Sequence, residues 1–219
     1  MWFRGMTITA WLAYLAGSGL ILHSTLLDYL PGGSGLFILQ KGAIGESALW
    51  RGSLYVHIAG GLLCLFSALP QLSRAVVRRW PSVHKIAGRI YGASVLVLVA
   101  PTGFHLAFFA KGGALGKLGF LTLAVAAFHT TLKGWRFALP RHRDMQAHRA
   151  WMIRSFAYAA SAVTFRIYHI AGYFAGLEPD TNYVLCLWLS LLGNAAVAEL
   201  ILRQKRQTAS LPIQLQTES

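Results

Sequence analysis

The chain has 219 residues, of which 55% are hydrophobic and only 12% are charged, and its mean hydropathy is +0.50. A soluble domain carries roughly 25% charged residues, so this composition excludes a soluble globular domain. It also excludes a disordered, collagen-like or coiled-coil chain. Twenty Lys and Arg residues against seven Asp and Glu residues give a net charge of +13. The composition predicts an all-α, polytopic membrane protein built as a helical bundle.

Six apolar stretches are long enough to cross a bilayer, which requires about 20 mostly apolar residues. They lie at about residues 7–27, 53–72, 90–110, 118–138, 151–177 and 181–202. Pro81 and Ser82 place the start of the third helix ahead of its apolar stretch, since proline suits a first helical turn. We expect residues 1–206 to form one six-helix transmembrane domain, followed by a polar, disordered tail over residues 207–219.

The basic residues alternate in density between the two sides of the predicted bundle. Fourteen of the twenty lie near the termini or around the connections that follow the second and fourth spans. The opposite connections hold only Lys41, Arg51, Lys111 and Lys117. The positive-inside rule therefore places both termini in the cytoplasm. Because topology accounts for the charge, we expect the lipid bilayer as a partner and no nucleic acid.

Histidines inside apolar spans are costly and therefore mark candidate functional positions. With a helical rise of about 1.5 Å per residue, four of them lie roughly 6–12 Å below the outer surface. These are His23, His57, His105 and His169. His84 and His148 open the third and fifth spans at the cytoplasmic side, so the chain has two levels of imidazole.

Two levels of histidine in a helical bundle favour haem b, whose iron takes neutral imidazoles from facing helices and whose propionates need nearby cations. In this interpretation His84 and His148 bind a haem iron at the cytoplasmic side. His57 binds an outer one together with His169 or His105. The cations are Arg154 and Arg166, and Arg166 lies on nearly the same helix face as His169.

Plainer interpretations stay open for other histidines. His142 lies in a basic run and is typical of a solvated residue, His23 is typical of an interfacial one, and His129 is suited to an interhelical hydrogen bond. The spans hold almost no acidic residues and the chain has no zinc signature. These features argue against a carboxylate proton relay, a di-metal oxidase and a hydrolytic triad.

Several motifs carry a resemblance to a known family. They are HIAG from His57, LPQL from Leu69, VHKIAGRIY from Val83, DMQAHRAWMIRS from Asp144 and TFR from Thr164. Together they resemble a bacterial family of predicted membrane proteins, domain-of-unknown-function family 2306, over about residues 54–203. The family pattern falls on His57, His84, His148, Arg154 and Arg166. The resemblance implies a multi-pass protein of the bacterial plasma (inner) membrane and carries no activity.

A looser likeness is to the cytochrome b-561 family. His57 near the start of one span, Gln71 at the far end of that span, and the spacing of Pro81, His84 and Gly88 in the next are similar to that family. The likeness implies a haem-binding four-helix core, transmembrane electron transfer and reduction of quinone-like or ferric acceptors.

Two functions therefore stay open. The first is a b-type haem protein in transmembrane electron transport, an oxidoreductase component with haem b as cofactor and a quinone or small redox protein as partner. The second is a non-redox small transporter or assembly factor that binds an anionic ligand through membrane-embedded His and Arg residues. The sequence leaves open whether the protein is an enzyme, which histidines pair, and the oligomeric state.

Overall fold

The structure is a computed structural model that describes residues 2–29 and 35–210, and over these residues every regular element is a helix. The principal helices are α1 (Trp2–Tyr29), α4 (Ala48–Leu72), α6 (Pro81–Ala93), α7 (Ala100–Ala107), α8 (Gly113–Ala138), α9 (Met145–Phe174) and α10 (Pro179–Ser210). The short ones are α2 (Leu36–Leu39), α3 (Ala43–Glu46), α5 (Arg74–Arg79), the π-helix η1 (Ser94–Val99) and the 3-10 helix η2 (Pro140–His142).

Local sequence explains where the helices begin. Ser47 and Ser73 cap α4 and α5 by accepting hydrogen bonds from the backbone N–H groups of the first turns. Asp144 accepts two such bonds, each of 2.9 Å, at the start of α9. Pro81 is the first residue of α6, where its missing N–H costs nothing. The predicted early start of the third helix is confirmed.

α6, η1 and α7 form one continuous helix from Pro81 to Ala107, interrupted by a π-helical stretch over Ser94–Val99. Pro101 follows at the start of α7 and has no backbone N–H to return to the preceding turn. Such π insertions change the hydrogen-bond register of a helix and occur frequently at functional sites. Here the carbonyl of Val99 bonds to a side chain of a neighbouring helix, as described below.

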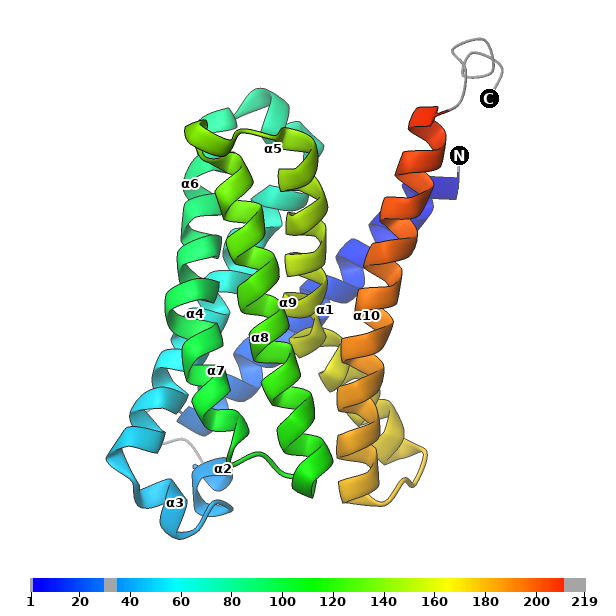
Figure 1. The fold of residues 1–219 in the computed structure, drawn as a ribbon. Coiled ribbons are helices and arrows are strands. Elements are labelled where there is room, and N and C mark those ends of the chain that lie inside the picture. The colour runs from blue at the N-terminus through cyan, green and yellow to red at the C-terminus, as the bar shows by residue number, and fades with distance from the viewer. Residues whose placement is uncertain (1, 30–34, 211–219) are drawn as a thin grey trace.

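Four membrane-length helices form a bundle, and two more pack against it (Figure 1). α4 packs on α6 and α7, α7 packs on α8, α8 packs on α9, and α9 packs on α4, which closes the ring. α6 and α9 are therefore diagonal partners that face one another across the interior. α10 lies along α9 and diverges from it toward the C-terminal end, while α1 crosses α9 and α4 obliquely (Figure 1).

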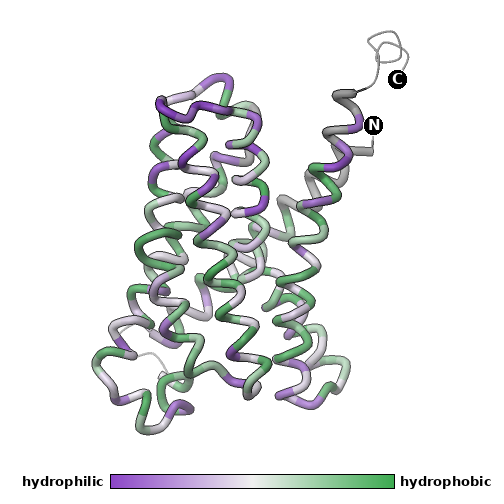
Figure 2. Tube along the Cα trace, in the orientation of Figure 1, coloured by the Kyte–Doolittle hydropathy of each residue, from purple (hydrophilic) through white to green (hydrophobic). Residues whose placement is uncertain are grey.

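Two clusters of buried side chains fill the interior. One contains Cys64, Ala68, Tyr91, Val95 and Ala127, with Met152 and Phe156 packed against it. The other contains Tyr14, Ile21, Leu65 and Val163, and it joins α1 to α4 and α9. Elsewhere the helices present apolar side chains outward, and the polar residues concentrate at the ends (Figure 2). This is the pattern that a bilayer requires.

Four segments are long and apolar enough to cross a membrane: Ala48–Gln71, Pro81–Ala107, Gly113–Ala138 and Pro179–Gln204. They correspond to the second, third, fourth and sixth predicted spans. The predicted first and fifth spans form α1 and α9, helices of 28 and 30 residues, which are not among these four segments. α9 carries Arg154 and Arg166 in addition to several hydroxyl groups, which lowers its apolar character.

The connections differ in how much of them the structure describes. Between α1 and α4 the chain forms α2 and α3, while residues 30–34 lie outside the described residues. α10 continues to Ser210, so residues 207–210 of the predicted tail are helical. The rest of that tail, residues 211–219, lies outside the described residues.

Candidate functional sites at two levels of the bundle

A hydrogen-bonded trio of hydroxyl groups crosses the centre of the bundle. The Tyr91 hydroxyl on α6 lies 2.8 Å from the Ser155 hydroxyl on α9, and that oxygen lies 2.6 Å from the Thr131 hydroxyl on α8. All three residues are buried, with at most 2% of their surface exposed. The trio establishes that α6 and α9 face one another at this height.

The same register brings His84 and His148 to facing positions. Each lies seven residues before a member of the trio, His84 before Tyr91 and His148 before Ser155. Seven residues are about two helical turns, so each histidine lies on the same face of its helix as that member. His148 is close enough to act electrostatically on His84, and so is Arg149. The structure therefore brings the predicted cytoplasmic pair together.

The hydrogen bonds of these two imidazoles differ. His148 Nδ1 lies 2.8 Å from the carbonyl oxygen of Gly134, so Nδ1–H donates to it, and in the neutral imidazole the lone pair is on Nε2. His84 Nδ1 is buried and has no hydrogen-bond partner among the described residues. The backbone carbonyl of His84 accepts a 2.7 Å hydrogen bond from the Gln71 side chain of α4. Gln71 thus fixes the first turn of α6, and His84 keeps an unused nitrogen.

Two of the outer histidines join α4 to α7. His57 Nδ1 lies 3.0 Å from the Val99 carbonyl oxygen and 3.1 Å from the Thr102 hydroxyl. The His57 ring also faces Gly103, where a Cβ atom would lie 3.0 Å from the ring. His105 Nδ1 lies 2.9 Å from the Ser53 hydroxyl on α4. Both imidazoles therefore make interhelical hydrogen bonds at one interface.

The third outer histidine, His169, lies at the interface between α9 and α10. Its ring stacks on Phe165 at 5.6 Å and meets the edge of Tyr183 at 6.0 Å. Its Nδ1 atom is buried and has no hydrogen-bond partner within the described residues. His57 and His105 form their hydrogen bonds between α4 and the helix that contains η1 and α7. Among the described residues, the structure gives His169 no hydrogen bond or ring contact with either of them.

Arg154 and Arg166, both on α9, have different surroundings. Arg154 Nε lies 2.5 Å from a carboxylate oxygen of Glu199 on α10, and its guanidinium lies 4.9 Å from the centre of the Trp151 ring. Arg166 takes part in no ion pair among residues 2–29 and 35–210, and its Nη1 donates to the Ala162 carbonyl over 3.3 Å. The charge of Arg154 is paired with Glu199, whereas Arg166 has no ion-pair partner in the part of the chain that the structure describes.

The remaining histidines have simpler environments. His23 and His142 are exposed, as an interfacial and a solvated residue would be. The His129 ring lies 5.6 Å from the Trp151 ring in an edge-to-face arrangement. Among the described residues, no group of three or more His, Cys, Asp or Glu side chains gathers at a point where it could bind a metal ion. A haem iron takes two imidazoles, so it does not require such a group of three.

Sequence reasoning missed several of the residues that build these levels. Tyr91 is part of one of the motifs quoted above and Ser155 ends another, so the motifs could have signalled them. Thr131 and Tyr183 carry no such signal, since threonine and tyrosine are ordinary in membrane helices. Only their contacts across helices, which depend on packing, mark them out.

Fold and sites together define a helical integral membrane protein with buried polar groups at two heights of its bundle. The chain belongs to the family of predicted membrane proteins called domain-of-unknown-function family 2306, whose model matches residues 54–202. The match includes most of α4, the other helices of the ring through α9, and most of α10. No curated protein and no solved structure matches the chain.

Proposed function

We propose that the protein is a b-type haem protein that passes electrons across the bacterial plasma membrane, with His84 and His148 as the axial ligands of one haem b. The observation that carries the proposal is the common register of His84 with Tyr91 and of His148 with Ser155 across the bundle. Two imidazoles on diagonal helices at one height are the arrangement that a haem iron takes in a helical bundle.

The surroundings of the two imidazoles fit such a group. Metal-ligating histidines commonly donate their other ring nitrogen to a carbonyl, which is what His148 does at Gly134. The buried, unpartnered nitrogen of His84 costs free energy unless something occupies the space beside the ring. Arg149 lies close enough to act electrostatically on His84, and its positive charge is suited to pairing with a haem propionate. A bound haem would supply one-electron redox chemistry at this height.

The outer histidines support a second haem less well. His57 and His105 use their Nδ1 atoms between α4 and α7, and His169 lies at a different interface. We therefore assign the haem to the cytoplasmic level alone, with a quinone or a small redox protein as its partner. The likeness to the cytochrome b-561 family supports this assignment through residue spacing only.

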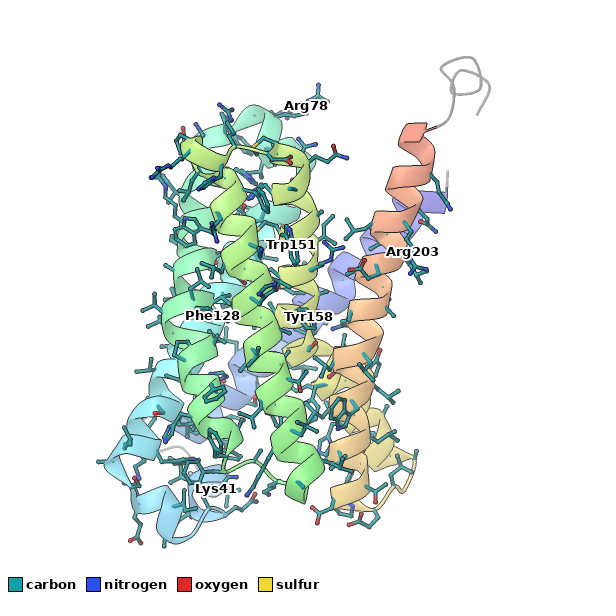
Figure 3. The ribbon with its side chains drawn as sticks, viewed as in Figure 1. Lys41, Arg78, Phe128, Trp151, Tyr158 and Arg203 are labelled. Carbon is teal, nitrogen blue, oxygen red and sulfur yellow. The ribbon has the colours of Figure 1, made fainter. Side chains whose placement is uncertain are left out.

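The proposed topology has six spans, with α1 and α9 added to the four most apolar segments and both termini in the cytoplasm. In support, the basic α5 and η2 lie at the same end of the bundle as the start of α1 and the end of α10 (Figure 1). Arg78 lies at that end and Lys41 at the opposite one (Figure 3). By the positive-inside rule the end with more basic residues is cytoplasmic.

The experiment is an absorbance spectrum of the detergent-purified protein, reduced minus oxidised, with a pyridine haemochrome assay to count haem per chain. We expect one haem and a sharp α band that is lost in His84→Ala and in His148→Ala. His142→Ala is the matched control, because His142 is an exposed histidine close in sequence to His148.

A colourless but folded protein, or a spectrum unchanged in both variants, contradicts the haem proposal. It would favour the second function, a non-redox transporter or assembly factor. Loss of the band in His142→Ala as well would show that the variants lose haem through general instability, and it would also count against ligation by the pair.

A further inference from the structure

Arg166 is a charged side chain in the outer half of the bundle, and no ion pair neutralises it among residues 2–29 and 35–210. It lies eight residues before the end of α9, which is about 12 Å along the helix axis. Its guanidinium has five N–H donors, and the one hydrogen bond that the structure gives it goes to the Ala162 carbonyl. Arginine at such a depth normally pairs with an anion, because an unpaired charge in an apolar medium is costly.

Arg166 and the groups around it come from four helices. Tyr29 at the end of α1 and Tyr183 near the start of α10 both act on it electrostatically. Arg166 in turn acts on His57 of α4, and Arg166 itself belongs to α9. Guanidinium and phenol groups are hydrogen-bond donors, and a phenol also accepts. This cluster, Tyr29, His57, Arg166 and Tyr183, is called the outer cluster below.

A second observation indicates a ligand beside the outer cluster. His169 lies three residues after Arg166 on nearly the same face of α9, and its buried Nδ1 has no partner among the described residues. Its ring is held against Phe165 and Tyr183, so it is not free to turn toward water. An unpaired cation and an unpaired imidazole nitrogen at one height are together best satisfied by a shared oxygen-rich group.

The depth of the cluster decides what carries that group. A small soluble anion would lose its hydration shell to reach a point about 12 Å below the end of α9, and that loss is costly. An amphiphile avoids part of the cost, because its apolar tail lies among the lipid chains while its head reaches the cation. The helices leave many large apolar side chains exposed, as such a tail requires.

We propose that the outer cluster binds the oxyanion head of a membrane amphiphile, a phosphate carried on a hydrocarbon tail, with Arg166 as the cation and the Tyr29 and Tyr183 hydroxyls as donors. This site is separate from the cytoplasmic histidine pair and does not rest on the haem proposal. The head group belongs either to a phosphate monoester on an isoprenoid tail or to the phosphate diester of a bilayer lipid.

The test is calorimetric titration of the full chain in a non-ionic detergent with farnesyl phosphate. Farnesol is the neutral counterpart, inorganic phosphate is the tailless one, and dioleoylphosphatidylglycerol is the diester. We expect farnesyl phosphate to bind, and Arg166→Gln to weaken binding by about tenfold or more, as loss of a hydrogen bond to a charged group does. Tyr183→Phe and Tyr29→Phe should each weaken it by a smaller factor.

Arg154→Gln is the matched control, because it removes an arginine of the same helix whose charge Glu199 already pairs. It should leave the affinity for farnesyl phosphate unchanged. Competition by dioleoylphosphatidylglycerol would identify the ligand as a bilayer lipid, and absence of competition would identify a monoester; either result supports the site. If Arg166→Gln does not fold, Tyr183→Phe and Arg166→Lys are compared with Arg154→Gln instead.

Three results would overturn the proposal. They are equal binding of farnesol, equal effects of Arg166→Gln and Arg154→Gln, and no binding of either phosphate amphiphile.

Asp28→Asn adds a further check, since Asp28 acts electrostatically on Tyr29. If Asp28→Asn lowers thermal stability as Arg166→Gln does, and if the Asp28→Asn variant also does not bind farnesyl phosphate, the anion that pairs with Arg166 is a group of the protein itself. The absorbance spectrum reports on the haem proposal independently of all these outcomes.

Discussion

The hydroxyl oxygens of Tyr91 and Ser155 lie 2.8 Å apart across the diagonal of the bundle, and this hydrogen bond joins two helices that are not neighbours in the ring. Because α6 and α9 both begin at the cytoplasmic end in the proposed topology, they run parallel. Positions separated by whole turns from the two residues therefore also face one another. The bond thus fixes the height at which His84 and His148 meet.

Ser155→Ala should lower stability more than Tyr91→Phe does. Tyr91→Phe removes one hydrogen bond and leaves Ser155 with Thr131, a loss of about 0.5–1.5 kcal/mol. Ser155→Ala removes both bonds and leaves the Tyr91 hydroxyl buried and unpaired, which costs about 1–3 kcal/mol. Thermal unfolding of the two variants and the parent in detergent measures the order. An equal or reversed order would mean that the trio does not link the helices.

A chemical cross-link tests whether His84 and His148 face each other. In a background with Cys64→Ala and Cys186→Ala, the pair His84→Cys and His148→Cys should be joined by a short bis-maleimide, and mass spectrometry of the linked peptides detects it. His84→Cys with Ala150→Cys is the control, because Ala150 lies two residues on and therefore points about 200° away around α9. Equal linking of the two pairs would contradict the register.

A methyl group at Gly92 should disturb the packing of α6 on α8. A Cβ atom there would lie 2.2 Å and 2.3 Å from two carbon atoms of the Trp135 ring, which is too large and rigid to give way easily. We expect Gly92→Ala to destabilise the protein by about 1–3 kcal/mol, as overpacking does. Gly61→Ala is the matched control in α4, because no heavy atom lies within 4 Å of its Cβ position. Thermal unfolding of both variants gives the comparison, and similar midpoints would contradict the tight contact.

The helices were largely predictable from the sequence, because apolar length and start signals are local properties. The apolar stretches correspond to α4, α6 with α7, α8 and α10, and Pro81 marked the start of α6. α9 was also predicted as a span, but it is not among the segments that are long and apolar enough. Arg154 and Arg166 reduce the apolar character of α9, and the structure shows that one of these charges has a partner on α10.

The contacts of the candidate sites were not predictable, because they depend on which helix faces come together. Arg154 pairs with Glu199, which lies 45 residues away in the chain. His57 and His105 have the depth expected of haem ligands, yet each bonds across the α4–α7 interface. The sequence did place His84 and His148 at the starts of two helices at the same end of the bundle, but it left open which histidines pair.

Glu178 should make the start of α10 sensitive to acid. Its carboxylate accepts hydrogen bonds from the backbone N–H groups of Asp180 and Thr181, at 3.0 Å and 2.7 Å. These bonds lower the pKa of Glu178 below its ordinary value of about 4.5. A carboxyl group whose pKa is lower in the folded state stabilises that state above its unfolded pKa, and the stabilisation is lost as pH falls through the folded pKa.

The measurement is the thermal midpoint of the parent and of Glu178→Gln between pH 7 and pH 3. At pH 7 the parent should be the more stable of the two, because glutamine cannot offer a charge to the first N–H groups of the helix. The difference should shrink steadily below about pH 4.5, where protonation removes that charge from the parent. Glu46→Gln, at an exposed acid of α3, is the control and should show no such convergence. A difference between parent and Glu178→Gln that stays constant over this range would mean that the carboxylate does not cap α10.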